Sequence, residues 1–175
     1  TGVIARYEAE LNSRRQKCRV SRVNSCALER WEKFLEEIAS LPRREQVEKV
    51  NTYLNERIYI VDPVNYGTKD YWATPKQFFN RNGDCEDYAI LKYLSLRRLG
   101  WKEKTLRVVA VKDLNLKVGH AVLVVLFTHP KTGQILPLLL DNQIKKIVPA
   151  NKVRHYQPVF SLNKFFCWKH THATS

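Results

Sequence analysis

Several features are missing from this 175-residue sequence, and each absence narrows the class of protein. No stretch of about 18 apolar residues occurs, so we expect no segment that inserts into a membrane. The start, Thr1-Gly2-Val3, lacks the charged-then-apolar pattern of a signal peptide, and a leader cleaved earlier would leave no trace in this numbering. Repeats and low-complexity segments are also absent. The 44% hydrophobic content instead predicts one globular domain over residues 1–175.

Acidic residues are scarce, with 17 Asp and Glu against 30 Lys and Arg, for a net charge of +13. Such a charge suits nucleic acid, an anionic surface or an acidic protein. The basic residues are scattered, however, and form no stripe interleaved with aromatic side chains. We therefore expect no nucleic-acid partner, and a nucleic-acid binder is the weakest alternative.

The four cysteines show no CxxC spacing, which argues against a structural zinc site. Cys18 and Cys26 would pair in an oxidising compartment, or would remain free, semi-buried thiols. Spacing alone leaves both possibilities open. Cys85 differs from the others because of its charged neighbours.

The first part of the chain, to about residue 100, has apolar residues at helical spacing. The expected helices, with a loop over residues 58–69 between the second and third, cover about residues 25–40, 44–56, 75–79 and 85–99. Thr74-Pro75 is a typical N-cap and first helical residue. The helix from Cys85 is apolar nearly all round, so we expect it to be the central, buried one.

The second part, about residues 101–165, has the alternating pattern of strands. The expected strands cover residues 106–111, 120–127, 135–141, 146–148 and 159–162. Helices followed by strands predict an α+β fold, with an antiparallel sheet packed on the central helix.

Cys85 begins that central helix, among the carboxyl groups of Asp84, Glu86 and Asp87. A helix N-terminus favours a thiolate, whereas flanking carboxylates oppose one. The conflict is resolved if the carboxylates bind a metal ion, and hard carboxylate oxygens suit Ca²⁺. The simpler alternative is that Asp84 caps the helix while Glu86 and Asp87 complement its dipole.

Residues 128–134 have the composition of a turn between two strands. A hairpin centred between Pro130 and Lys131 places His120 directly opposite Asp141, with Cβ atoms about 5 Å apart. Together with Cys85, these residues have the chemistry of a thiol nucleophile, its base and the group that orients the base. Each alone is more often an ordinary structural residue, and it is their combination that indicates catalysis.

Four sequence blocks occur in an order that resembles a known family: residues 71–75 (YWATP), 83–93 (GDCEDYAILKY), 119–123 (GHAVL) and 138–142 (LLLDN). They resemble the bacterial transglutaminase-like cysteine proteinases of the LapG type. The likeness extends from about Trp31 to Ser161, and departs at Ala121, where the family pattern has methionine.

The resemblance implies a papain-like, transglutaminase-like fold. It also implies a periplasmic, calcium-dependent endopeptidase that cuts a large biofilm adhesin near its N-terminus and so releases it from the cell surface. A LapD-like inner-membrane receptor would control the protease in response to cyclic di-GMP. By motif match, Cys85 would be the nucleophile, His120 the general base, Asp141 its orienter, and Asp84, Glu86 and Asp87 the Ca²⁺ ligands.

Trp72 lies in the first of these blocks and would line the substrate cleft or belong to the core. Two other functions fit the same residues. A transglutaminase-like acyltransferase would use the same triad to transfer an acyl group to an amine, and a non-catalytic binding module would use the surface only to dock a partner.

Overall fold

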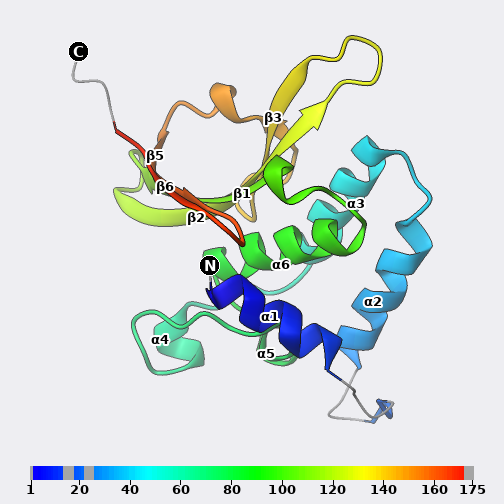
Figure 1. Cartoon of the computed structure of the whole chain (residues 1–175). Helices are drawn as coiled ribbons and strands as arrows, with labels where there is room; N and C mark the ends of the chain where they lie inside the picture. The colour runs from blue at the N-terminus through cyan, green and yellow to red at the C-terminus, as the bar shows by residue number, and fades with distance from the viewer. Residues whose placement is uncertain (1, 14–17, 22–25, 172–175) are drawn as a thin grey trace.

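The computed structural model describes residues 2–13, 18–21 and 26–171, and in it a helical half precedes a strand half (Figure 1). The α-helices are α1 Gly2–Asn12, α2 Ala27–Ile38, α3 Arg43–Asn55, α4 Asp62–Asn65, α5 Pro75–Arg81 and α6 Cys85–Arg98. The strands are β1 Leu106–Asp113, β2 Val118–Thr128, β3 Ile135–Leu140, β4 Val148–Pro149, β5 Tyr156–Leu162 and β6 Cys167–Lys169. Two short 3-10 helices, η1 Glu103–Thr105 and η2 Ala150–Lys152, lie between them.

The strands form one antiparallel sheet in the order β4-β3-β2-β1-β5-β6, and the α-helices gather on one of its faces (Figure 1). This confirms the expected α+β class. The sheet continues to Lys169, beyond the expected end near residue 165. Strand β6 was not predicted, because three residues are too few to show an alternating pattern.

Helix α6 is the centre of the molecule, as its composition predicts. Every residue from Asp87 to Leu96 is buried. The helix packs against β2 on one side and against α3 on another. The first turn of α6 is therefore held against the strand that carries His120.

Local sequence signals explain the segment that leads into α6. Thr74 and Gln77 form a capping box at the start of α5, in which each side chain accepts a hydrogen bond from the other residue's backbone N–H. Asn82 ends α5 in the left-handed region, at φ 65°.

The prediction of a loop over residues 58–69 was partly wrong. This stretch contains the one-turn helix α4, which is too short to show helical periodicity.

The β2–β3 hairpin differs from the predicted register by two residues. Thr128 pairs with Ile135 and Leu123 with Leu140, so the hairpin is centred one residue later, between Lys131 and Thr132. Side chains alternate between the two faces of a strand, so a shift of two positions keeps each side chain on its face. His120 and Asp141 thus meet diagonally instead of directly opposite each other.

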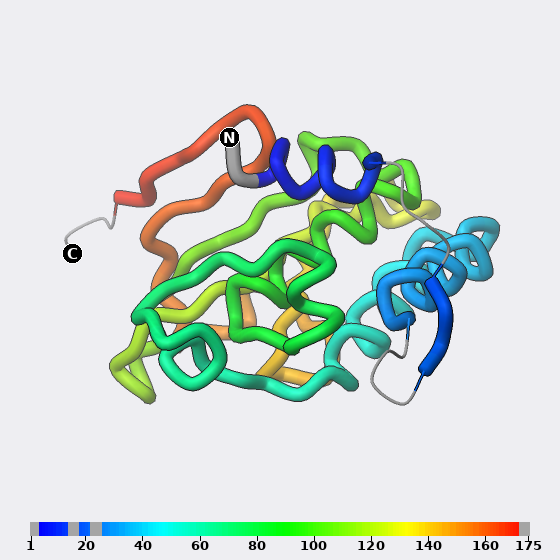
Figure 2. Tube along the Cα trace, turned by 90° about the horizontal axis from the view of Figure 1, so that it is seen from below, coloured from blue at the N-terminus to red at the C-terminus, as the bar shows by residue number. Residues whose placement is uncertain are grey.

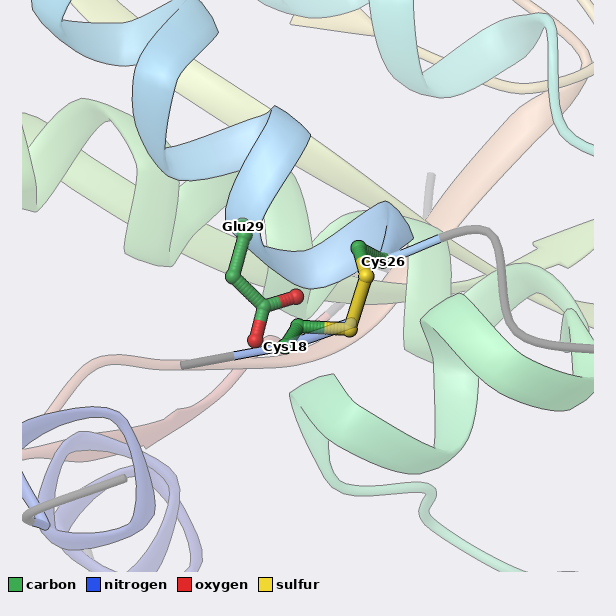
Figure 3. A group of neighbouring side chains, drawn as sticks. All are labelled: Cys18, Cys26 and Glu29. Atoms are coloured by element: carbon green, nitrogen blue, oxygen red, sulfur yellow. A yellow bond between two sulfur atoms is a disulfide. The ribbon is translucent and has the colours of Figure 1, made fainter. Parts of the chain in front are cut away.

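Cys18 and Cys26 form a disulfide (Figure 3), which decides between the two alternatives that the sequence left open. Figure 3 shows Glu29 of α2 beside it. Because both sulfur atoms are oxidised, this group of residues offers no thiolate to a metal. The disulfide fastens residues 18–21 to the start of α2.

Helix α1 runs beside the stretch that leads into β6 (Figure 2), and the two are joined by an ion pair between Glu8 and Lys164, at 2.5 Å. Within the described ranges, no helix is both long and apolar enough to cross a membrane.

Candidate active site

The Cys85 thiol is half-buried at the first residue of α6. It donates a hydrogen bond to Glu86 Oε2, at 3.2 Å, and lies near the backbone N–H of Ala121. Burial, followed by the charges of Glu86 and Asp84, raises the pKa of Cys85 far above its usual range, and the Ala121 N–H acts in the opposite direction. Without a positive charge on its carboxylate neighbours, the thiol therefore stays protonated.

His120 and Asp141 form a buried pair next to this thiol. Nε2 of His120 lies 2.8 Å from Asp141 Oδ1, and the two side chains are 2% and 0% exposed. Ala121 follows His120 in β2. Because the backbone of Ala121 lies near Cys85 Sγ, the thiol lies close to His120. The hydrogen bond expected between His120 and Asp141 is thus present.

Asp141 receives two further hydrogen bonds that the sequence did not reveal. The Tyr156 hydroxyl donates to Oδ2, at 2.7 Å, and the backbone N–H of Gln143 donates to Oδ1, at 3.0 Å. Burial acts to raise the pKa of Asp141, but the hydrogen bonds from His120, Gln143 and Tyr156 outweigh it and lower the pKa. Asp141 is therefore an ionised acceptor at neutral pH, so Nε2 of the neutral His120 ring carries hydrogen and Nδ1 is the nitrogen that has a lone pair.

The side-chain amide of Gln143 lies 3.4 Å from this Nδ1. Tyr156 comes from β5, which reaches the site only through the strand order of the sheet, so no local signal could have identified it. Gln143 lies two residues after the predicted Asp141, and a correct hairpin register would have placed it opposite His120.

The acidic residues near Cys85 converge on a residue that the sequence interpretation missed. The buried residues Asp62, Asp84 and Asp87 each offer a carboxylate oxygen within 4.8 Å of the others. A second such group joins Asp62 to Asp70 and Glu86. Asp62, in α4, belongs to both groups and so links the three predicted ligands.

Asp87 also has a structural role. Its Oδ1 accepts the Ala73 N–H, at 2.8 Å, and its Oδ2 accepts the Asp84 N–H, at 3.3 Å. A Cβ atom on Gly83 would lie 2.2 Å from Asp87 Oδ2, so glycine is required for this close approach. Asp87, which in the simpler alternative was expected only to complement the helix dipole, thus takes part in the cap at Asp84, and this role is compatible with metal binding because each oxygen has a second lone pair.

The electrostatics of the cluster fit a hard divalent cation. Burial is the largest cause that raises the pKa of Asp62 and Glu86, and it raises the pKa of Asp87 to about 7. Oδ1 of Asp62 and Oδ1 of Asp84 are buried and accept no hydrogen bond from the described part of the chain. Ca²⁺ binds oxygen ligands. An ion at this position would coordinate the unsatisfied oxygens and neutralise the charge of the crowded carboxylates.

Trp72 is half-buried and packs against the main core. Its indole N–H donates to Asp70 Oδ1, at 3.1 Å, and its carbonyl accepts the Tyr7 hydroxyl. A place for Trp72 in the substrate cleft stays a prediction.

An antiparallel sheet packed on a helix that begins with cysteine, with a His–Asp pair on the adjoining strands, is the arrangement of transglutaminase-like cysteine enzymes. The sequence matches the bacterial transglutaminase-like cysteine proteinases (BTLCP) over residues 13–165. The chain belongs to this family. No curated protein sequence gives a significant match.

Solved structures agree with this assignment. LapG of Legionella pneumophila is 27% identical, with a TM-score of 0.75, and the match covers 99% of this chain and 88% of that one. Calcium-bound LapG from the same organism is 28% identical, with a TM-score of 0.72, over 98% of this chain and 92% of that one. The fold and the resemblance to LapG-type proteinases are confirmed.

Proposed function

We propose that the protein is a calcium-dependent cysteine endopeptidase with Cys85, His120 and Asp141 as its catalytic triad. The observation that carries this proposal is the buried His120–Asp141 pair, whose histidine lies on the strand that packs against α6, the helix that begins with Cys85. Membership of a cysteine proteinase family supports the reaction class.

The mechanism follows from the protonation states of the site. His120 Nδ1 takes the thiol proton, while Asp141 holds the ring through Nε2–H and stabilises the imidazolium. The Cys85 thiolate attacks the peptide carbonyl carbon, and backbone N–H groups at the start of α6 stabilise the oxyanion. His120 then gives its proton to the leaving amine. Water attacks the thioester, which releases the acid product and restores the thiol.

The residues that would hold calcium are Asp62, Asp84 and Glu86, with Asp87 as a further ligand. When bound, the ion supplies positive charge that offsets the carboxylates beside the thiol. The chain's own groups then favour the thiolate, through the helix N-terminus and the Ala121 N–H.

The proposal includes the biology that the LapG-type resemblance implies. The substrate is the N-terminal region of a large biofilm adhesin, and a LapD-like receptor for cyclic di-GMP controls access to the protease. The proposed location is the periplasm. The Cys18–Cys26 disulfide supports this location, because disulfides persist in oxidising compartments.

A direct test incubates an adhesin N-terminal fragment with the protein and identifies the products by mass spectrometry. Hydrolysis yields two fragments whose masses sum to that of the substrate plus water, whereas acyl transfer to an amine yields a heavier, crosslinked product. Cys85→Ala and His120→Ala are expected to abolish cleavage, while Cys167→Ala, which changes the exposed free cysteine, retains it. Full activity in either triad variant would contradict the assignment.

A further inference from the structure

Lys92 is a basic residue whose side chain lies in the apolar interior of the protein. It lies on α6 seven residues after Cys85, which is two helical turns along the same face, about 10 Å away. Its side chain is fully buried, at 0% exposed. Nζ makes no hydrogen bond to any residue that the structure describes, and it lies 5.9 Å from the centre of the Tyr88 ring. A buried ammonium without a hydrogen-bonding partner is strongly unfavourable, so its presence calls for a functional reason.

The charge that acts on Lys92 is the carboxylate of Asp141. Burial lowers the pKa of Lys92 to about 7, and Asp141 opposes this effect. Helix α3, which packs against α6, also holds the Asp141 segment, because Asn55 Nδ2 donates to the Asp141 carbonyl, at 2.7 Å. Other polar groups around the triad end of α6 include His120 from β2, Tyr156 from β5, the amide of Asn55 from α3, and the carboxyl groups of the first turn of α6 itself, Asp84, Glu86 and Asp87.

Two buried amide oxygens lie on the same segments. Oδ1 of Asn55, from α3, and Oδ1 of Asn142, next to Asp141, have no donor among the described residues. Both amides lie beside Asp141, since Asn55 donates to its carbonyl and Asn142 follows it in the chain.

We propose that Lys92 is a positioning residue of the triad, whose buried ammonium offsets part of the negative charge of Asp141. It thereby limits how tightly Asp141 holds the His120 imidazolium. The inference rests on the proposed function, in which His120 both takes a proton from the thiol and releases it to the leaving amine. A carboxylate without this offset would retain the imidazolium and slow the release of the proton.

The test is the pH titration of the His120 ring, followed by NMR of labelled histidine in a calcium-loaded Cys85→Ala background. The signal of His120 is identified by its loss in His120→Gln. Lys92→Met keeps the length and removes the charge, and we expect the midpoint of the His120 titration to rise by about half a unit to one unit. An unchanged midpoint would overturn the proposal, since Lys92 would then be neutral or too distant to act.

Thermal unfolding separates this role from a purely structural one. Replacement of an unpaired buried ammonium by Met is expected to leave the melting temperature unchanged or to raise it, while kcat, measured with Cys85 intact, falls about tenfold and KM stays constant. Leu96→Met, on the same helix and equally buried, is the uncharged control and should change neither kcat nor the titration. A lower melting temperature in Lys92→Met together with an unshifted titration would assign the lysine a structural role only.

The two hypotheses fail in different ways. If the wild-type protein does not cleave the adhesin fragment, the proposed function is wrong, and the His120 titration can still be read because it needs no turnover. If the wild-type protein cleaves and the titration does not move in Lys92→Met, the inference about Lys92 alone is wrong.

Discussion

At the scale of single residues, the chemistry depends on how the carboxyl groups around Cys85 are neutralised. Glu86 accepts the thiol hydrogen directly, and Asp84 adds to the local negative charge. Both effects oppose the thiolate that a cysteine proteinase needs. Asp62 belongs to both groups of carboxyl residues that could hold a cation, so it is the residue that joins them in the proposed calcium site.

Asp62→Asn tests this role with little change in shape. We expect the affinity for Ca²⁺, measured by isothermal titration calorimetry, to fall on the order of tenfold or more, because an anionic ligand is lost. Glu37→Gln, which removes an exposed carboxylate from α2, is the control and should bind Ca²⁺ as the wild type does. Equal affinity in Asp62→Asn would remove Asp62 from the ligand set.

Tyr156→Phe tests the support of the triad acid. The variant leaves Oδ2 of Asp141 without its hydroxyl donor, so we expect a loss of about 1–3 kcal/mol in the free energy of unfolding and a lower kcat. Tyr93→Phe is a matched control, since its buried hydroxyl bonds to Glu103 instead. Urea unfolding should show a loss in both variants, whereas steady-state cleavage should show one only in Tyr156→Phe. Unchanged kcat in Tyr156→Phe would mean that the hydroxyl has no part in orienting the base.

At the scale of elements, α6 has two roles that can be predicted from its sequence: it forms the centre of the core, and it carries the thiol at its first residue. The apolar residues after Asp87 make it the buried centre of the fold, and the polar first turn presents the thiol at the edge of the sheet. Because β2 packs on α6, a single helix–strand contact sets the distance between Cys85 and His120, the proposed nucleophile and base. Residues 18–21, by contrast, are fastened to the start of α2 by a covalent bond, the Cys18–Cys26 disulfide.

The Cys18–Cys26 disulfide is expected to stabilise the fold through the unfolded state. A separation of eight residues between the linked positions corresponds to about 2.5 kcal/mol of chain entropy. We therefore expect the double variant Cys18→Ser/Cys26→Ser to lose about this free energy of unfolding in urea, with kcat unchanged at low temperature. Cys167→Ser, at the exposed cysteine, should lose none. Equal stability of the double variant and the wild type would show that the crosslink adds nothing.

The helices that were predicted most accurately are those whose sequences carry strong local signals. The capping box at Thr74 and the apolar length of α6 are local, and both helices were expected within a few residues of their observed bounds. The hairpin register was wrong by two, since turn composition does not fix the turn centre. Asp62 and Tyr156 could not be found, because only the tertiary fold brings α4 and β5 to the residues that they contact.

At the scale of the whole molecule, we expect the acidic cluster to couple stability to pH and, through the proposed metal site, to calcium. The pKa of Asp87 is raised by burial from its ordinary value to about 7, and burial also raises the pKa of Asp62. A carboxyl group whose pKa is raised on folding stabilises the fold while it is protonated, and this contribution is lost as the pH rises through the folded pKa. Calcium bound in the proposed site would reverse the loss, because the ion binds the ionised form.

The melting temperature is therefore expected to depend on calcium in a pH-dependent way. The difference between the calcium-loaded and the chelator-treated protein should be small near pH 4 and should grow up to about pH 7, the window set by Asp87. Differential scanning fluorimetry across this range measures it. Asp62→Asn should show a smaller difference at every pH. A difference that is independent of pH would contradict the link between these carboxyl groups and the metal.

The central claim is that calcium in the acidic cluster activates Cys85 as a nucleophile. The most direct measurement is the rate of alkylation of Cys85 by iodoacetamide, with Cys167 as the internal reference, followed by peptide mass spectrometry in calcium and in chelator. We predict that calcium accelerates alkylation of Cys85 by about tenfold or more and leaves Cys167 unchanged. Equal rates at Cys85 with and without calcium would contradict the account.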